Sequence, residues 1–520
     1  MKDCENTGTS GPVNDLIAFE ELRVGPVEVA TDRISAPYRL KSVTGETSET
    51  VLTYRYHEPV FHPGHAPDIN LASMILVQVA LNYGLFCRKI VFDGYFDDQD
   101  RIFIRRMMEN TNREVLVMKF LHHNPFLTRP FDGLECSGAT GTHAIIEFIG
   151  PKGSRKSLKQ GLWEGSMSGH CILSSGGKDS LLSYGLLREI DKDVHPVFVN
   201  ESGRHWFTAL NAYREFSRTD PNTARVWCNS DRVFNHFLMK MPFIRKDFNR
   251  IRSDDYPIRM WTVAVFLFGV LPILRKRGLG RLIIGDEYDT TRRGSECGII
   301  HYYGLYDQSR FFDNALTAYF RKKGWGVHQF SILRSLSELL IIKILSERFP
   351  GLQRMQVSCH AAHAVNGVMV PCGRCEKCIR VAGMMQALGK DPGSIGYTAA
   401  QAGHMLMQLQ NVRVHQDPED AGHLYHLLAA RGILRDGSAS MAFARANPPT
   451  MKLRFYRERS VLSEIPDDLR GPLMQIFLQH AEGACMKAGR QWKNMDPTLL
   501  TGSRGRDVSS VLPAGNRPLM

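Results

Sequence analysis

The chain has 520 residues, of which 43% are hydrophobic and 23% charged, and its formal net charge is +12. This length indicates two or three globular domains, and eleven cysteines in so long a chain exclude a small secreted domain built on a dense disulfide framework. The basic excess suits an anionic partner such as a nucleotide or RNA, although a solvated, mildly basic surface explains it equally well.

The two ends of the chain, residues 1–15 and 501–520, are predicted to be loose tails. The first of them lacks the apolar core of a secretory signal. The most apolar run, Met260–Leu274, is shorter than the ~20 residues of a membrane span and contains Pro272, so it predicts a buried helix. We therefore expect a cytoplasmic protein without membrane contact.

Residues 16–152 are predicted to form an N-terminal α+β domain. An apolar helix is expected near residues 70–86. The strand-like stretches are residues 50–57, 88–96 and 113–121. The segment 153–170, which contains several glycines and serines, is predicted to be a linker.

Residues 171–395 are predicted to form an α/β domain, because short apolar runs alternate there with longer helical patterns. That alternation is typical of a parallel sheet covered by helices. The predicted strands are residues 171–173, 195–199, 224–228 and 281–285. Residues 396–500 contain helical patterns and predict a helical extension whose role the sequence does not indicate.

A glycine-rich turn follows the first of these strands, in the sequence SSGGKDS at residues 174–180. Gly176 and Gly177 can turn successive N–H groups to one side, and the following helix adds its unpaired N–H groups and positive dipole end. This combination predicts a site for a nucleotide phosphate, where Lys178 neutralises charge and Asp179 helps to place Mg²⁺. The hydroxyls able to donate hydrogen bonds there belong to Ser174, Ser175 and Ser180. A glycine turn that merely joins strand to helix is the alternative; neither a Walker loop nor a GxGxxG motif is present.

A second motif is a cysteine cluster. Cys372, Cys375 and Cys378 have C-x2-C-x2-C spacing, and Cys359 lies upstream. Four thiolates predict a closed, structural Zn²⁺ site. Two histidines, His360 and His363, are alternatives to Cys359 as the fourth ligand. The neighbouring cations that would offset the thiolate charge are Arg374, Lys377 and Arg380. An iron–sulfur cluster is the rival, but the ferredoxin pattern would need a cysteine where Ala382 stands.

Acidic residues follow the strand at 281–285, at the sheet edge where ligands bind in open α/β folds. Gly285 and Asp286 precede Glu287 and Asp289. Either of the latter two could bind Mg²⁺, orient a ribose or act as a base, and plain loop acids are the alternative.

Three arginines are further candidates. Arg292 and Arg293 suit phosphate or carboxylate oxygens, or form a solvated pair. Arg334 and Glu338 have the i,i+4 spacing of a helix salt bridge.

The string Ser-Gly-Gly-Lys-Asp-Ser resembles the pyrophosphate loop of the PP-loop ATP pyrophosphatase superfamily, whose members form adenylates from ATP. Together with the cysteine cluster it resembles two branches, the ATP-dependent UDP-N-acetylmuramoyl-L-alanyl-L-glutamate epimerases and, next, the 7-cyano-7-deazaguanine synthases. Residues 171–388 carry the resemblance. The blocks shared in order with the epimerases are SGGKDS, IIGDEYDTTRRGSE, LYDQSRFFDNALTAYFRKKG, FSILRSLSELLIIKIL and SC…CGRCEKC.

The resemblance implies an adenine-nucleotide alpha-hydrolase-like, parallel-sheet domain that binds ATP and Mg²⁺ and adenylates a small carboxylate-bearing substrate, most like a muramoyl dipeptide that is then epimerised. It implies that Glu287 or His301 is the base and raises Arg334 as a substrate or nucleotide contact. The implied catalytic residues are Lys178, Asp179, Glu287, Arg292 and Arg334. The implied nucleotide-binding residues are Ser174, Ser175, Gly176, Gly177, Lys178, Asp179, Ser180 and Gly285.

Three other functions stay open at this point. The synthase branch would convert the adenylate to an amide and then a nitrile, and other PP-loop enzymes modify tRNA. A non-enzymatic, zinc-organised nucleic-acid-binding module would account for the cysteines and charge but leaves the glycine turn unused.

Overall fold

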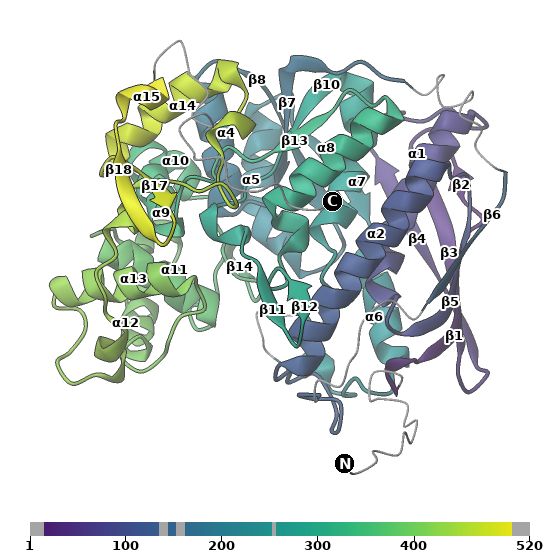
Figure 1. The fold of residues 1–520 in the computed structure, drawn as a ribbon, viewed down its shortest axis with the longest axis horizontal. Coiled ribbons are helices and arrows are strands. Elements are labelled where there is room, and N and C mark those ends of the chain that lie inside the picture. The colour runs from purple at the N-terminus through teal and green to yellow at the C-terminus, as the bar shows by residue number, and fades with distance from the viewer. Residues whose placement is uncertain (1–14, 135–143, 152–161, 252–255, 502–520) are drawn as a thin grey trace, which may run out of the picture.

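The computed structural model describes residues 15–134, 144–151, 162–251 and 256–501. Its centre is an eleven-stranded sheet in the order β13-β10-β7-β8-β9-β4-β3-β1-β5-β6, with β2 paired to β3 (Figure 1). The strands are β1 (Phe19–Val24), β2 (Glu28–Val29), β3 (Arg33–Ser42), β4 (Thr47–Tyr56), β5 (Cys87–Asp93), β6 (Ile145–Ile149), β7 (Ser166–Ser174), β8 (Asp193–Asn200), β9 (Ala224–Cys228), β10 (Leu279–Ile283) and β13 (His328–Phe330).

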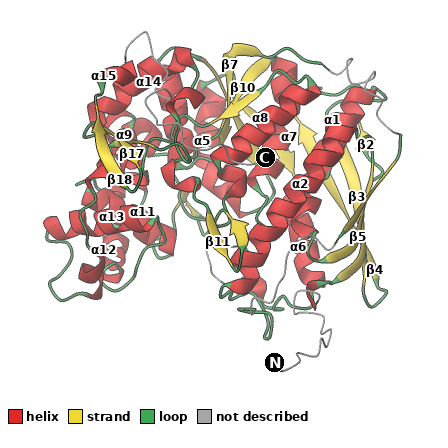
Figure 2. Ribbon diagram, in the orientation of Figure 1, coloured by secondary structure: helices red, strands yellow, loops and turns green. Residues whose placement is uncertain are grey.

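Helices flank this sheet, and helices α1 and α2 lie in front of its N-terminal strands in the view of Figure 2. Their bounds are α1 (Ala66–Leu76), α2 (Asp98–Val115), α4 (Lys178–Glu189), α5 (Arg204–Thr219), α6 (Ser230–Lys240), α7 (Val263–Arg277), α8 (Arg310–Lys323), α9 (Glu338–Arg348), α10 (Pro350–Gln353), α11 (Glu376–Ala387), α12 (Ala399–Gln408), α13 (Pro418–Ala430), α14 (Asp467–His480) and α15 (Thr498–Thr501). Two hairpins form separate two-stranded sheets, β11–β12 (Gly294–Glu296, Ile299–His301) and β14–β15 (His363–Val365, Val368–Val370).

The predicted α/β class and the four strands predicted after residue 170 are confirmed. Strands β13, β10, β7, β8 and β9 are mutually parallel. The chain runs from β7 through β8 to β9 and then returns to place β10 on the other side of β7. The carboxyl ends of β7 and β10 therefore meet where the strand order reverses, which is the position of ligand sites in open α/β sheets.

The predicted N-terminal unit shares this sheet with the rest of the chain. Strand β4 pairs antiparallel with β9, so that Tyr54 lies opposite Cys228 and Tyr56 opposite Val226. The predicted linker also differs from the structure. Its last five residues, 166–170, begin β7, while residues 153–161 lie outside the described residues, as do 1–14 and 502–520 of the predicted tails.

The strand predicted at residues 113–121 is wrong, because Arg113–Val115 end helix α2 and Leu116–Leu121 form a π-helical turn. Helix α2 starts from a capping box in which Asp97 and Asp100 each accept the other's backbone N–H at 2.9 Å. Because the capping box stabilises the first turn of α2, the helix extends into residues 113–121, whose apolar sequence by itself favours a strand.

The extension after residue 395 is not purely helical. Besides α12, α13 and α14 it contains a three-stranded sheet of β16 (Leu453–Phe455), β17 (Ala484–Ala488) and β18 (Gln491–Met495). The helical pattern predicted for residues 396–500 is therefore wrong at these strands. The extension is joined to the main sheet by Arg281 of β10, whose guanidinium donates to both oxygens of Asp468 at 2.6 and 2.8 Å.

The apolar run at 260–274 forms most of α7, a 15-residue helix whose central residues are fully buried, as predicted. Among the described residues, no helix is both long enough and apolar enough to cross a membrane.

Candidate functional site

The glycine loop, residues 174–180, joins the end of β7 to the start of α4. Gly176 has φ +70°, and a Cβ there would lie 2.6 Å from the carbonyl oxygen of Thr208 in α5. Gly177 begins helix α4 as its N-cap, and the atom nearest to its absent side chain is Ser175 Oγ at 3.3 Å. No side chain of the described residues caps the first turn of α4. The loop thus presents an open glycine and uncapped helical N–H groups, which is the arrangement that binds anions.

Gly285 brings the carboxyl end of β10 against this loop. A Cβ on Gly285 would lie 2.7 Å from Asp179 Cβ and 2.8 Å from the Asp179 carbonyl carbon. Only glycine permits this approach, which places the acidic residues after Gly285 beside the first turn of α4.

Lys178 lies at the centre of the site. Its ammonium is 2.7 Å from Asp179 Oδ1, 3.3 Å from Glu287 Oε1 and 3.2 Å from Glu338 Oε1. Its side chain is buried, which disfavours the charged form, but the three carboxylates outweigh burial and raise the pKa of Lys178 well above its usual value. We refer to these four residues as the lysine–carboxylate group.

An acidic triplet overlaps this group: carboxylate oxygens of Glu287, Asp289 and Glu338 all lie within 4.8 Å of one another. Burial, followed by the negative charge of Glu338, raises the pKa of Asp289 to about 7. Burial, followed by the negative charge of Asp179, also raises the pKa of Glu287. Within the described part of the chain Asp289 Oδ1 has no hydrogen-bond partner. Three clustered carboxylates of which one oxygen is unpartnered fit a hard cation such as Mg²⁺.

Arg334 does not face this group. Its guanidinium donates to Asp313 and Asp286, and to the hydroxyls of Thr290 and Thr291 at 3.2 and 3.0 Å. These bonds fix the loop after β10 and leave Arg334 no free donor face for a ligand. The predicted helix salt bridge with Glu338 is wrong, because α9 begins only at Glu338.

The other predicted basic residues lie near the β11–β12 hairpin. The Arg292 guanidinium stacks 4.5 Å from the ring centroid of Tyr303, and Arg293 is exposed. His301 is buried, and its Nδ1 accepts the Tyr303 N–H at 3.2 Å. Among the described residues none of the three is hydrogen-bonded to the lysine–carboxylate group.

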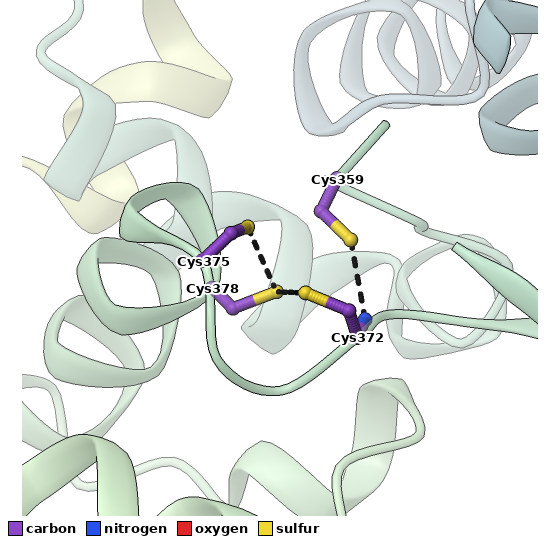
Figure 3. A group of neighbouring side chains, drawn as sticks. All are labelled: Cys359, Cys372, Cys375 and Cys378. Carbon is purple, nitrogen blue, oxygen red and sulfur yellow. Dashed lines mark hydrogen bonds between the residues drawn. The ribbon is translucent and has the colours of Figure 1, made fainter. Parts of the chain in front are cut away.

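The cysteine cluster is assembled as predicted, and Figure 3 shows the four thiols converging. All four sulfurs lie within 4.8 Å of one another, with Cys378 Sγ 3.8 Å from Cys372 Sγ and 3.5 Å from Cys375 Sγ. Sulfurs bound tetrahedrally to zinc at ~2.3 Å are about 3.8 Å apart, so the spacing fits Zn²⁺. The fourth member is Cys359.

Neither of the alternative fourth ligands takes part in this cluster. His363 is exposed in β14, and the ring of His360 packs against His205, at 4.4 Å between centroids.

Sequence reasoning missed three contacts to the site. Arg380 in α11 has its Nε 3.5 Å from Glu338 Oε2, and Gln416 donates to the same oxygen at 3.0 Å. The Tyr288 ring, between Glu287 and Asp289, lies 3.9 Å from the Arg454 guanidinium. The sequence places Arg380 beside the thiolates and gives no reason to connect it with Glu338, and no local signal marks Gln416 or Arg454.

No protein-family model matches the sequence, and a search of curated proteins finds no match. A solved structure to which the chain is similar is the crystal structure of the terminal R domain from the myxalamid PKS-NRPS biosynthetic pathway. The identity is 13%, over 68% of this chain and 95% of that chain, and the TM-score is 0.21, which carries no inference about fold or function.

Proposed function

We propose that the protein is an ATP pyrophosphatase that adenylates a substrate carboxylate and releases pyrophosphate. The observation that carries the proposal is the contact between the glycine loop and the acids after β10, made through Gly285. Through this contact the glycine loop, a buried lysine and a carboxylate triplet lie together at the sheet's switch point, which supports the proposal. A nucleotide phosphate with its Mg²⁺ is the ligand that uses all three.

The position of each residue in the site determines the role that we propose for it. The N–H groups in the first turn of α4 would hold phosphate oxygens, and Asp289 and Glu338 would hold Mg²⁺. When bound, Mg²⁺ supplies charge neutralisation for the departing pyrophosphate. Lys178 counteracts part of the rise that burial causes in the pKa of Glu287, and it holds the three facing carboxylates close together before ligands arrive.

The cysteine cluster has a supporting role in this proposal. Zinc held by the four thiols would fix the start of α11, because Cys375 is its N-cap and Cys378 lies in its first turn. Helix α11 carries Arg380 to Glu338. The metal would therefore position a cation at the lysine–carboxylate group without contacting the substrate.

The reaction that follows adenylation is proposed to be epimerisation. A free carboxylate's negative charge makes its α-proton very hard to remove, whereas a neutral acyl adenylate withdraws electrons from the α-carbon. Glu287 is the proposed base, because burial raises its pKa and so strengthens it as a proton acceptor. Reprotonation on the other face and hydrolysis then give the epimer and AMP.

The test is isotope exchange with UDP-N-acetylmuramoyl-L-alanyl-L-glutamate as the probe. The wild type is expected to exchange pyrophosphate into ATP, to form AMP and pyrophosphate in equal amounts, and to introduce solvent deuterium at the α-carbon. Gly177→Val and Asp179→Asn should abolish turnover, and Glu287→Gln should slow deuterium entry more than pyrophosphate release. Lys240→Gln removes an exposed positive charge at the end of α6, outside the site, and is the control for a general effect of charge. Full turnover in both loop variants would overturn the proposal, and ammonia consumption without α-exchange would indicate amide formation instead.

A further inference from the structure

A pocket of ≈ 870 Å³ lies between the middle of α4, the second half of α5, the end of α9, the short helix α10 and the turn of the β14–β15 hairpin. This volume is within the range of about 300–1,000 Å³ that small-molecule sites occupy in proteins. We refer to it as the arginine pocket. Its charged and apolar walls include Tyr184, Arg214, Arg218, Arg348, Leu352 and Arg354.

The arginine pocket is separate from the lysine–carboxylate group, although α4 and α9 contribute to both. Helix α9 begins at Glu338 and reaches the pocket at Arg348, and helix α4 begins at Lys178 and reaches it at Tyr184. With a rise of ~1.5 Å per residue, these positions lie about 15 Å apart along α9 and about 9 Å apart along α4. A ligand in the pocket would therefore leave the first turn of α4 free.

Two of the four arginines in the pocket are already paired with carboxylates. The Arg348 guanidinium donates to both oxygens of Glu189, and Arg218 lies 2.7 Å from Glu215. Glu215 is the one acidic residue among those that line the pocket. These pairs are neutral as a whole and leave little charge for a ligand.

The other two arginines have no carboxylate partner in the described part of the chain. Arg214 is exposed, and its guanidinium donates one hydrogen bond, at 2.5 Å, to the carbonyl oxygen of Gly367 in the β14–β15 turn. Arg354 is exposed, and its side chain has no hydrogen bond, ion pair or ring contact with another described residue. The pocket therefore presents two uncompensated positive charges whose N–H groups are largely free.

An apolar wall faces the same space and is fixed by its own contacts. The Tyr184 ring stacks on Phe216 with 4.2 Å between centroids, and its hydroxyl donates to Asp220 at 2.8 Å. Leu352 packs directly on α4, since a Cβ on Gly185 would lie 2.8 Å from Leu352 Cδ1. The pocket thus combines an ordered aromatic and aliphatic wall with free guanidinium groups.

We propose that the arginine pocket binds a phosphate monoester that carries an aromatic body. A phosphate monoester has a charge of about −1.5 to −2 near pH 7, which matches the two uncompensated arginines. The planar fork of a guanidinium group donates two parallel hydrogen bonds to phosphate oxygens, and the apolar wall covers the aromatic body. The inference does not depend on the proposed function, because no residue of the glycine loop takes part in it.

The test measures equilibrium binding to the full-length protein by calorimetry, with phenyl phosphate, inorganic phosphate and phenol as probes. The wild type should bind phenyl phosphate at least tenfold more tightly than either of the other two, because each of them lacks one half of the ligand. Arg214→Gln and Arg354→Gln should each weaken phenyl phosphate at least fivefold. Arg354→Gln removes no contact within the described protein, so a loss of binding in this variant does not come from misfolding.

Two control variants separate the pocket from other anion sites. Arg232→Gln, at an exposed position of α6, should change the affinity for phenyl phosphate less than twofold, and so should Gly177→Val in the glycine loop. Absent binding of phenyl phosphate, unchanged affinity in both pocket variants, or a loss in Gly177→Val alone would overturn the inference. Equal affinity for inorganic phosphate would also overturn it, since the apolar wall would then contribute nothing.

Nucleoside monophosphates and smaller aryl phosphates share this chemistry, and AMP distinguishes them. Its binding is measured in Gly177→Val with and without Arg354→Gln, so that the pocket contribution is the difference between the two variants. A larger contribution for AMP than for phenyl phosphate would support the pocket as a nucleotide site. A smaller one, with phenyl phosphate still lost in Arg354→Gln, would support a site for a compact aryl phosphate.

Discussion

The side-chain amide of Gln416 donates a 3.0 Å hydrogen bond to Glu338, which is also 3.2 Å from the Lys178 ammonium. The C-terminal extension thus reaches the lysine–carboxylate group directly. A second contact has the same effect: Ser337, the N-cap of α9, donates to the Thr450 carbonyl at 2.7 Å. The extension completes the surroundings of Glu338, a role that its sequence does not indicate.

Gln416→Leu should lower the free energy of unfolding by about 1–3 kcal/mol, because it removes a hydrogen bond to a buried carboxylate while keeping the side-chain volume. Urea denaturation measures the change. Gln491→Leu, at an exposed position of β18, is the control and should alter stability by less than about 0.5 kcal/mol. Equal effects of the two substitutions would show that the contact to Glu338 contributes nothing.

Gly176→Ala should destabilise the protein more than Gly278→Ala. Both glycines have positive φ, +70° and +63°, so each alanine costs about 1–2 kcal/mol in backbone strain. Only at Gly176 would the new Cβ also clash, 2.6 Å from the Thr208 carbonyl oxygen, whereas no atom of the described residues lies within 4 Å of the corresponding position at Gly278. Thermal unfolding separates the two contributions, and equal melting temperatures would contradict the close packing of the glycine loop on α5.

Metal analysis should find about one zinc per chain, and Cys375→Ser should lose that zinc and lower the melting temperature. Structural zinc contributes on the order of 10 kcal/mol in small domains, and less is expected here because a large core packs beside the cluster. Cys485→Ser, also a buried free thiol, should keep its zinc. Stoichiometric iron with labile sulfide would show that the assignment to zinc is wrong.

Glu201→Gln should stabilise the protein at alkaline pH and not at acid pH. Burial raises the pKa of Glu201 from 4.5 to about 6, and its Oε2 has no partner among the described residues. Between pH 4.5 and about 6, Glu201 keeps its proton in the folded state and releases it in the unfolded state. The stability of the wild type therefore falls as the pH rises through this range.

The predicted gain of Glu201→Gln is therefore about 2 kcal/mol at pH 8 and close to zero below pH 4.5. Denaturation series at both pH values test it. A gain from Glu201→Gln that is the same at both pH values would refute the titration argument.

The strands of the central sheet are predicted best where apolar residues gather in a short run. Residues 195–199 and 224–228 read as short apolar runs, and both are strands of the central sheet. The errors occur where an apolar run follows a helix. Residues 113–121 remain helical because the capping box at Asp97 stabilises the start of α2. Residues 484–488 form a short strand because they pair with β16 and β18.

The candidate site was predictable only where it is contiguous in sequence. The glycine loop and the C-x2-C-x2-C motif each carry their geometry within a few residues. Tertiary packing brings Glu338 to Lys178 and Gln416 to Glu338, whereas the sequence spacing pairs Glu338 with Arg334. Local spacing cannot reveal that Arg334 is instead held by Asp313 of helix α8.

The pairing of β4 with β9 has a consequence for how the chain is made. The Thr53 N–H donates a hydrogen bond to the Asn229 side chain across this junction, although the two residues are 176 positions apart. Strand β4 is therefore synthesised before β5–β8 and lacks its partner β9 until they have been made. Until then its unpaired N–H and C=O groups are open to strands of other nascent chains. Dividing the gene at the predicted linker would leave two fragments, one with the edge of β4 unpaired and the other with the edge of β9 unpaired. Each fragment is expected to aggregate alone, and the two are expected to associate through these edges when mixed.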